Sequence, residues 1–280
     1  MHYVISDIHG HTKTFLEFAN SLCEDDKVFV IGDTIDKGDG TLDVLTYIMN
    51  DKRFTFLLGN HEYMLYKELY YKKKVEEYEN SKLIGKNIEE KWFHYQRKSW
   101  ESWSVYTMND GERTLLNYFE KPEKEQERIF NYLANALIQT EVNVCGRNFI
   151  LVHAVPYPTN KDIKLSDFNI EYDDKKIEKY IWDRKYYEKI PSKIIVTGHN
   201  LNKYTFGHSS IESDGKYDND KLRKMGEYGK TKCIEPFQWA CIDTNLAMRD
   251  SLISKLGILC LEDLSFEVRK NLDDTDRNIF

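Results

Sequence analysis

Five short runs of apolar, largely β-branched residues recur along the chain, and each of them ends in a polar residue. The runs cover residues 3–7, 28–33, 54–60, 149–153 and 194–199, and they end in Asp7, Asp33, Asn60, His153 and His199. Continuous apolar runs of this length indicate strands that are buried on both faces. Because ligands of α/β sheets bind beyond the carboxyl ends of the strands, we expect these five side chains to meet at one edge.

The segments between and after these runs have other patterns. Helical periodicity over roughly residues 12–23 and 40–51 predicts a βαβαβ beginning with right-handed crossovers. Residues 62–135 are charged and aromatic with helical periodicity and no strand pattern, which predicts a helical cap inserted between two strands. Residues 203–232, rich in Gly, Lys, Asp and Ser, indicate a long loop, and the apolar runs within 237–268 predict a second, antiparallel sheet. The fold class is therefore α/β, or α+β by some schemes.

Composition narrows the class of protein. The 280 residues are 41% hydrophobic, enough for a well-buried core, and the net charge of −7 argues against general nucleic-acid binding, which depends on Lys and Arg. The five cysteines include no C-x-x-C pair, so neither a disulfide framework nor a thiolate zinc site is indicated. No signal peptide or membrane-length apolar run is evident, and we expect a cytoplasmic protein with no membrane partner.

The polar strand ends carry the candidate chemistry. Taken singly, each has an ordinary structural explanation: Asp7 and His9 can form a turn, Asn60 can cap a helix, and His153 and His199 can be half-buried structural histidines. Taken together, they assemble a mixed nitrogen and oxygen ligand set without sulfur. Such a set favours manganese, iron or zinc over a metal that prefers soft ligands.

The order of these motifs resembles that of the calcineurin-like metallophosphoesterases, specifically the phosphoprotein phosphatase type shared by serine/threonine phosphatases and symmetrical diadenosine tetraphosphatases. The matching motifs are Asp7-Ile-His9-Gly10, Gly32-Asp33-Thr-Ile-Asp36-Lys37-Gly38, Gly59-Asn60-His61-Glu62, Val152-His153-Ala154 and Gly198-His199, with weaker echoes in Asn109-Asp-Gly-Glu, Ile181-Trp-Asp-Arg184 and Ile242-Asp-Thr. The resemblance spans roughly residues 3–261 without the cap and the 203–232 loop. It implies one domain over residues 1–280, built as a two-sheet β-sandwich flanked by helices.

The resemblance also implies roles for individual residues. It puts Asp7, His9 and Asp33 on one divalent metal ion, and Asp33, Asn60, His153 and His199 on a second, with Asp33 as the bridge. It places His61, paired with Asp36, beside the leaving group as the catalytic acid. Asn60, Lys37 and Arg184 would bind the substrate phosphate. The family usually has Arg at the position of Lys37, and Lys offers a point charge instead of a bidentate fork.

The implied activity is hydrolysis of phosphomonoesters by a metal-bound hydroxide, with two metal ions, manganese being expected and iron or zinc possible. The leading hypothesis is a serine/threonine protein phosphatase acting on a phosphorylated protein. The alternative is hydrolysis of diadenosine tetraphosphate, another dinucleoside polyphosphate or another small phosphoester or nucleotide, because the metal core is common to both. A metal-binding scaffold without catalysis is disfavoured, since every proposed ligand and the acid pair are present.

Overall fold

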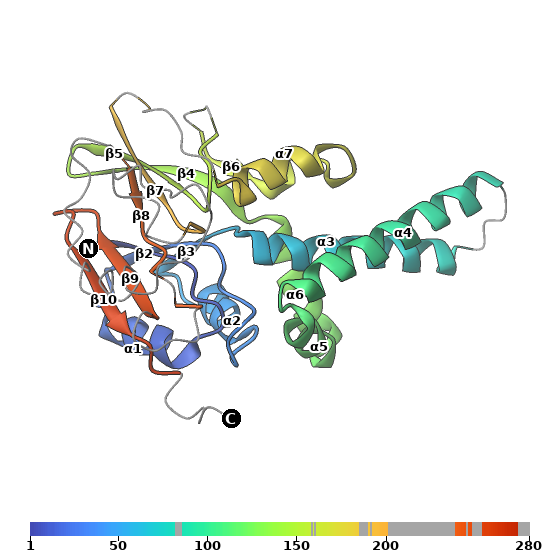
Figure 1. Cartoon of the computed structure of the whole chain (residues 1–280), viewed down its shortest axis with the longest axis horizontal. Helices are drawn as coiled ribbons and strands as arrows, with labels where there is room; N and C mark the ends of the chain where they lie inside the picture. Colours follow the sequence, from blue (N-terminus) through green and yellow to red (C-terminus); the bar gives the residue numbers. More distant parts are fainter. Residues whose placement is uncertain are drawn as a thin grey trace, which may run out of the picture.

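The computed structural model describes residues 1–81, 86–157, 159, 161–184, 190, 192–200, 239–244, 246–247 and 254–273. A curled sheet with flanking helices forms the body of the molecule, and a helical arm projects from it (Figure 1). The fold is therefore of the mixed α/β class that the sequence predicts. The 203–232 loop lies outside the described residues.

The chain begins with the expected alternation of strands and helices. The elements are β1 (His2–Ile5), α1 (Thr12–Ser21), β2 (Lys27–Ile31), α2 (Asp43–Asn50) and β3 (Phe54–Leu57). The three strands are parallel and pair in the order β1-β2-β3. Alternate residues of β2 face opposite ways: Val28 and Val30 pack with the cluster that includes helix α1, while Ile31 belongs to a second cluster.

The later strands extend this sheet. They are β4 (Leu137–Val144), β5 (Arg147–Val152), β6 (Ile163–Lys164), β7 (Lys193–Thr197), β8 (Trp239–Cys241), β9 (Lys255–Cys260) and β10 (Phe266–Lys270). The described strands pair in the order β10-β9-β1-β2-β3-β4-β5-β7-β8, with β6 beside β4. Strands β9 and β10 are antiparallel, as expected, whereas β8 runs parallel to β7.

The sequence predicts two sheets packed as a sandwich. In the structure, the two layers are the two halves of one continuous sheet. The halves meet between β3 and β4, where the parallel register pairs only Leu57 with Leu137. One buried apolar cluster contains Val4 and Ile31 from the first half together with Phe149 and Val196 from the second. The halves therefore pack face to face through apolar side chains, and the path curls at the β3–β4 junction.

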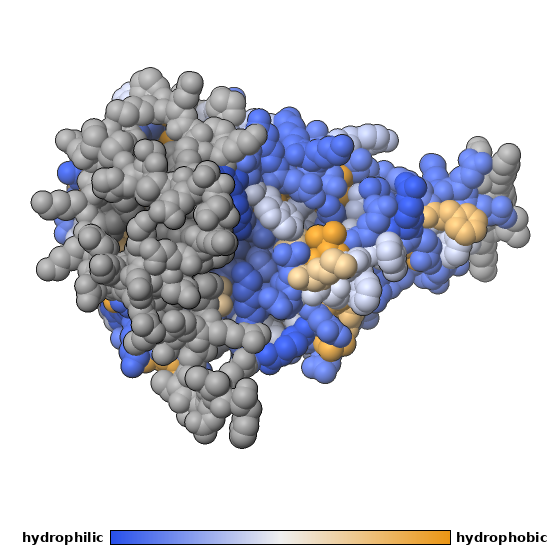
Figure 2. Space-filling view, in the orientation of Figure 1, coloured by the Kyte–Doolittle hydropathy of each residue, from blue (hydrophilic) through white to orange (hydrophobic). Residues whose placement is uncertain are grey.

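Four described helices lie between β3 and β4: α3 (Asn60–Asn80), α4 (Lys86–Met108), α5 (Glu112–Glu120) and α6 (Glu123–Ala134). Helices α3 and α4 run side by side and form the projecting arm (Figure 1). The tyrosines Tyr71, Tyr95 and Tyr106 are buried in the core, whereas Trp100 and Trp103 are exposed. The visible face of the arm is mostly hydrophilic with scattered apolar patches (Figure 2). Division of the chain into one domain with an inserted cap stays a prediction.

The remaining helices are the short 3₁₀ helix η1 (Leu165–Asp167) and α7 (Ile170–Trp182). Helix α7 is tied to α3 through Lys67, whose Nζ lies 2.9 Å from Asp174 Oδ2 and 2.9 Å from Glu178 Oε1. None of the described helices combines the length and the apolar character needed to cross a membrane.

Candidate active site

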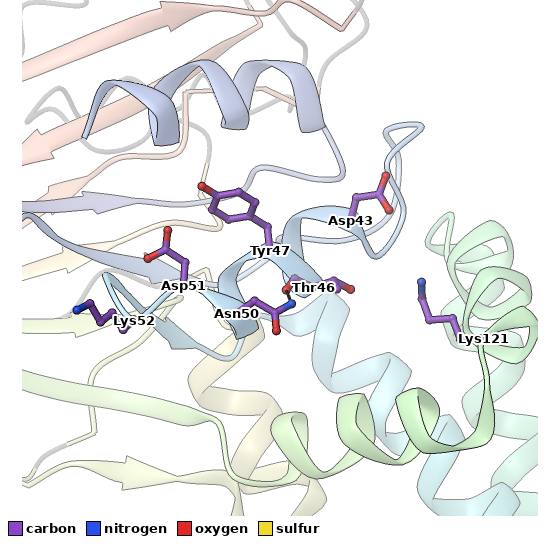
Figure 3. A pocket seen from close by; sticks show the side chains of 7 residues that line it. All are labelled: Asp43, Thr46, Tyr47, Asn50, Asp51, Lys52 and Lys121. Atoms are coloured by element: carbon purple, nitrogen blue, oxygen red, sulfur yellow. Dashed lines mark hydrogen bonds between the residues drawn. The ribbon is translucent and has the colours of Figure 1, made fainter. Parts of the chain in front are cut away.

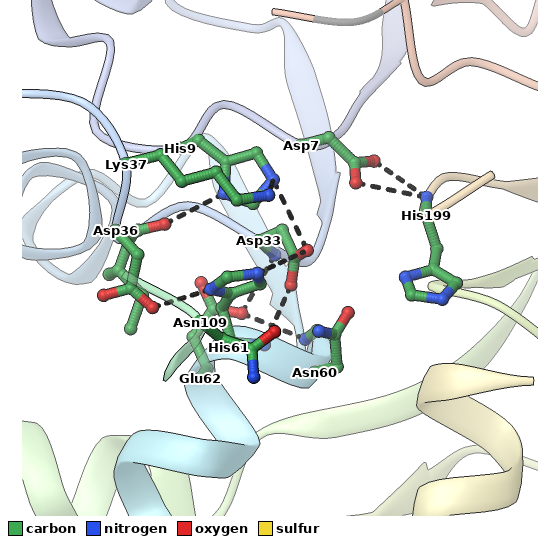
Figure 4. Close-up of polar contacts among 12 residues, drawn as sticks. Asp7, His9, Asp33, Asp36, Lys37, Asn60, His61, Glu62, Asn109 and His199 are labelled. Atoms are coloured by element: carbon green, nitrogen blue, oxygen red, sulfur yellow. Dashed lines mark hydrogen bonds and ion pairs between the residues drawn. The ribbon is translucent and has the colours of Figure 1, made fainter. Parts of the chain in front are cut away.

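The polar residues that follow five strands meet at one edge of the sheet, as the sequence predicts. Asp33, after β2, lies at the centre of this group (Figure 4). Its Oδ2 is 3.6 Å from His9 Nε2 and 4.0 Å from His61 Nε2. Its Oδ1 is 3.5 Å from His153 Nε2. One buried carboxylate therefore faces imidazoles on both sides.

Two overlapping sets of potential metal ligands share Asp33. One set is His9, Asp33 and His61, and the other is Asp33, His153 and His199; within each set the ligand atoms all lie within 4.8 Å of one another. All of these residues are buried. The donors are imidazole nitrogens and carboxylate oxygens, which suit borderline divalent metals. The donor chemistry therefore fits two divalent metal ions, but the first set contains His61, which the sequence assigns as the acid, and does not contain the predicted ligand Asp7.

The remaining predicted ligands, Asn60 and Asp7, are also close. Asn60 Oδ1 lies 3.0 Å from His153 Nε2. Helix α3 takes Gly59 as its N-cap, so the alternative role of Asn60 as a helix cap does not apply. Asp7 belongs to neither set above, and its carboxylate accepts the backbone N–H of His199 at 3.0 Å. Burial, together with the negative charges of Asp243 and Asp33, raises the pKa of Asp7 well above its usual value. A nearby cation would favour the charged carboxylate and so lower this pKa.

Backbone carbonyls orient three of the imidazoles. His9 Nδ1 lies 3.1 Å from the Ile35 carbonyl, and His153 Nδ1 lies 2.7 Å from the Ile31 carbonyl. Because a carbonyl oxygen only accepts, the proton sits on Nδ1 and the Nε2 lone pair faces Asp33. His199 has the opposite arrangement, with Nε2 3.2 Å from the Trp182 carbonyl.

Burial also sets the charge of these three imidazoles. It lowers the pKa of His153, and lowers the pKa of His9 and His199 well below the usual range. Positive neighbours add to the effect: Lys37 beside His9, and Arg184 beside His199. A metal binds neutral imidazole, so all three are in the form that a ligand requires.

His61 differs from the other three because carboxylates hold both of its nitrogens. Its Nδ1 donates to Asp36 Oδ2 at 2.7 Å, and its Nε2 faces Asp33 (Figure 4). Burial alone would lower the pKa of His61, but the negative charges of Asp33 and Asp36 raise it above the usual value. His61 is therefore the imidazole in this cluster that is equipped to carry and donate a proton.

The backbone bends sharply where the site residues leave the strands. The residues with left-handed φ angles between 48° and 69° include Asp7, His9, Asp33, Asp36, Lys37 and His199. Non-glycine residues rarely adopt this conformation, and such strain concentrates at functional sites. At Gly59 an added Cβ would fall 2.2 Å from Asp33 Oδ1. Only glycine therefore lets this carboxylate approach the start of helix α3, where it accepts the His61 backbone N–H at 3.0 Å.

Glu62 supports the central loop, a role that the sequence did not reveal although the residue belongs to one of the motifs. Its carboxylate accepts the backbone N–H groups of Asp33 at 2.9 Å and of Gly59 at 3.1 Å, and the Thr34 hydroxyl at 2.8 Å. Burial and the neighbouring charge of Asp33 raise the pKa of Glu62 to about 7. Glu62 thereby joins the turn after β2 to the first turn of α3.

The two cationic residues predicted to bind phosphate border the cluster and are exposed. Lys37 Nζ lies 3.2 Å from His9 Nε2. Arg184 Nη1 donates to the His199 carbonyl at 3.0 Å. Both positive charges are therefore close to the candidate ligands.

Tyr106 is a site residue that the sequence analysis missed. Its hydroxyl, from α4, donates to Asp36 Oδ1 at 2.8 Å. The sequence signal that could have indicated it was the weaker motif match Asn109-Asp-Gly-Glu, which begins three residues after Tyr106.

A separate surface groove of about 760 Å³ lies between α2 and the α5–α6 connection (Figure 3). It is lined by Asp43, Thr46, Tyr47, Asn50, Asp51, Lys52 and Lys121. None of these is a candidate site residue, so the groove is separate from the candidate active site.

The fold and the shared N/O ligand sets define a metal-dependent phosphoesterase. The sequence profile of the calcineurin-like phosphoesterases matches residues 3–223, and the chain belongs to this family of dinuclear metal hydrolases. A symmetrical bis(5′-nucleosyl)-tetraphosphatase from Wigglesworthia glossinidia brevipalpis is 42% identical over 65 residues, which cover 22% of this chain and 24% of that relative. A crystal structure provisionally assigned as a diadenosine tetraphosphatase has a similar fold, with a TM-score of 0.50 and 12% identity over 97% of this chain and 94% of that chain.

Proposed function

We propose that this protein hydrolyses phosphomonoesters and that its substrate is a protein carrying phosphoserine or phosphothreonine. The observation that carries the proposal is the position of His61, whose Nδ1 donates to Asp36 and whose pKa is raised by Asp33 and Asp36, within a cluster of neutral imidazoles. A buried group that keeps a proton next to candidate metal ligands is suited to protonate a departing oxygen.

The leaving group explains why such an acid favours an alkyl phosphate. Serine and threonine leave as strongly basic alkoxides, which need a proton in the transition state. A nucleotide leaving from a polyphosphate chain departs as a phosphate whose second pKa is only about 6, so it needs much less help. The buried acid pair therefore supports the monoester over the anhydride.

The metal ligands in this proposal are those that the sequence suggested. Asp7, His9 and Asp33 would hold one ion, and Asp33, Asn60, His153 and His199 the other, with manganese as the expected metal. The position of Asp33, with an imidazole facing each oxygen, supports its assignment as the bridge. When bound, such a metal pair activates water for in-line attack and neutralises charge on the phosphate.

The cations at the border would orient the substrate. Lys37 and Arg184 would hold phosphate oxygens together with the Asn60 amide, and Arg184 can do so through a planar fork. His61 would then donate the proton on its Nε2 to the leaving oxygen, while Asp36 holds Nδ1 and stabilises the charged imidazole. No residue of the chain needs to form a covalent bond to phosphorus in this scheme.

A second candidate function is hydrolysis of dinucleoside polyphosphates. It is favoured by the names of the relatives, one a symmetrical bis(5′-nucleosyl)-tetraphosphatase and one provisionally assigned as a diadenosine tetraphosphatase. The sequence match covers only a short segment, and the structural match supports the fold alone. We therefore base the proposed substrate on the acid pair.

A substrate comparison separates the two functions. Purified protein with added manganese is assayed on a phosphoserine peptide, diadenosine tetraphosphate and a cyclic nucleotide. We expect the highest kcat/KM on the phosphopeptide. A value at least tenfold higher on diadenosine tetraphosphate would establish the second candidate, and no turnover of any substrate by metal-loaded protein would overturn both.

The role of His61 is tested by its replacement with Gln. General acids contribute roughly 10²- to 10⁴-fold in rate, so His61→Gln should lower kcat on the phosphopeptide by about that factor. The loss should be far smaller on p-nitrophenyl phosphate, whose leaving group delocalises its charge. His94→Gln, at an exposed position of α4, is the matched control. Equal losses on both substrates with normal metal content would assign His61 to another task.

A further inference from the structure

The carboxylate of Asp36 accepts a hydrogen bond from a different side chain on each oxygen. Burial raises the pKa of Asp36, and a further interaction with the buried Thr114 hydroxyl offsets part of this rise. Oδ2 accepts from His61 Nδ1 at 2.7 Å, and Oδ1 accepts from the Tyr106 hydroxyl at 2.8 Å. Asp36 is 1% exposed and Tyr106 is 0% exposed, so both groups are buried away from the surface. The chain of contacts therefore runs from α4 through Asp36 to His61.

The end of α4 is built to hold Tyr106 in this position. The Gly111 backbone N–H donates to the Tyr106 carbonyl at 3.1 Å, and a Cβ added at Gly111 would fall 2.2 Å from the tyrosine ring. A glycine is thus needed where the chain turns from α4 into α5. Burial and the charge of Asp36 raise the pKa of Tyr106 well above its usual value, so the hydroxyl keeps its proton and donates it.

We propose that Tyr106 is a positioning residue of the acid pair: its hydroxyl holds the Asp36 carboxylate in the rotation that presents Oδ2 to His61 Nδ1. The proposal rests on the proposed role of His61. The terminal torsion of an Asp side chain is broad, so a single hydrogen bond defines it weakly and a second one restricts it. The helical arm thereby supports the acid pair through a residue 70 positions away from Asp36.

The proposal predicts a loss that depends on the leaving group. Without the hydroxyl, Asp36 can turn and His61 presents its Nε2–H less often in the direction of the departing oxygen. Phenyl phosphate and p-nitrophenyl phosphate differ little in size, but phenolate is the more basic leaving group. We expect Tyr106→Phe to lower kcat about tenfold on phenyl phosphate and less than about twofold on p-nitrophenyl phosphate.

The chain offers a matched control in Tyr63. This buried tyrosine, 1% exposed, also donates to a carboxylate, Asp174 Oδ1, at 2.8 Å. Tyr63→Phe removes the same group from a similar contact that does not touch the acid pair. The experiment uses the full chain with manganese to measure kcat on both aryl phosphates, bound metal and Tm. It uses the chain loaded with zinc, which is diamagnetic, to record the NMR signal of the His61 ring Nδ1–H.

The expected result is a bias toward the better leaving group in Tyr106→Phe alone, with unchanged metal content and a shifted or broadened His61 Nδ1–H signal. An equal loss on both aryl phosphates, no loss, or the same bias in Tyr63→Phe would overturn the proposal.

The His61→Gln variant separates this failure from that of the proposed function. If His61→Gln shows the bias and Tyr106→Phe does not, the positioning role fails and the acid stands. If His61→Gln shows no bias, the proposed acid fails. In that case the NMR signal tests whether Tyr106 affects the Asp36–His61 hydrogen bond. An unchanged His61 Nδ1–H signal in Tyr106→Phe would overturn the positioning role as well.

Discussion

Four buried histidines surround Asp33. They differ in the group that forms a hydrogen bond with one of the two ring nitrogens. Backbone carbonyls hold His9, His153 and His199, and burial keeps these imidazoles neutral. A carboxylate holds His61, whose pKa is raised above the usual value by Asp33 and its carboxylate partner despite burial. Residues of one type thus differ in charge and in hydrogen bonding through their burial and their partners.

Asp33 is the residue on which the metal assignment depends. Asp33→Asn keeps the shape but removes the negative charge between the two ligand sets, so we expect the protein to lose at least one of two bound metal ions. Activity should fall roughly a hundredfold or more, since even supporting residues of metal sites contribute 10- to 100-fold. Metal content by mass spectrometry and kcat with manganese measure both effects. Asp25→Asn, at an exposed position, is the control, and full activity of Asp33→Asn would contradict the bridging role.

Substitution of Lys37 tests whether this residue binds the substrate phosphate. In Lys37→Arg a planar fork replaces a point charge, so we expect kcat/KM to be maintained or to rise severalfold. Arg184→Ala should lower kcat/KM instead, because it removes a fork from the border of the site. Steady-state kinetics with measured metal content decide the question. Loss of activity in Lys37→Arg with normal metal content would show that Lys37 does something other than hold phosphate.

At the level of elements, helix α3 joins the site to the arm. It starts at Asn60 in the ligand cluster, extends to Asn80, and packs along α4. Between these helices lies Glu68, which is buried and whose Oε2 has no hydrogen-bond partner within the described structure. Burial raises the pKa of Glu68 to about 7, and Lys72 and the Ser99 hydroxyl offset this only in part.

Glu68 should therefore make the stability of the protein depend on pH. The folded protein holds this proton more tightly than the unfolded chain, so the stability present below about pH 4.5 is lost as the pH rises through about 7. We expect Glu68→Gln to have a higher Tm than the parent at pH 8, by a few degrees, and little difference at pH 5. Thermal melts at both pH values measure this. Glu76→Gln, on the exposed side of α3, should show no such trend, and an equal shift at both pH values would contradict the explanation.

At the scale of the whole molecule, the site straddles the two halves of the curled sheet. Asp7, Asp33 and Asn60 follow strands of the first half, and His153 and His199 follow strands of the second. The sheet joins these halves through a single registered pair between β3 and β4. Ligands from both halves on shared metal ions would therefore tie the halves together.

Metal binding should accordingly stabilise the fold. A ligand at 100 times its Kd adds about 2.7 kcal/mol per site, which corresponds to a rise in Tm on the order of 5–10 °C for a protein of this size. Differential scanning fluorimetry with and without manganese, after chelation, measures this shift. Asp33→Asn should lose most of it. An unchanged Tm at millimolar manganese would contradict a site shared by the two halves.

The strands that carry the site, and nitrogen and oxygen as its donor atoms, could be predicted from the sequence alone. Each strand is a short apolar run, so local hydrophobic pattern suffices to locate it, and the polar residue at its end marks the sheet edge where Asp33 and His153 meet. The absence of paired cysteines likewise pointed to nitrogen and oxygen ligands. The helices α1 and α2 followed from the same local reasoning.

How these parts act together depends on contacts between distant segments of the chain. The packing of the two halves, the carbonyl partners of the imidazoles and the contact of Tyr106 with Asp36 join residues far apart in the chain, and no local pattern encodes them. The left-handed backbone at Asp33 and His199 is unfavourable on its own and persists because surrounding contacts hold it. Charge is likewise a property of the folded site, since neighbouring carboxylates raise the pKa of His61 despite its burial, whereas burial lowers the pKa of His153.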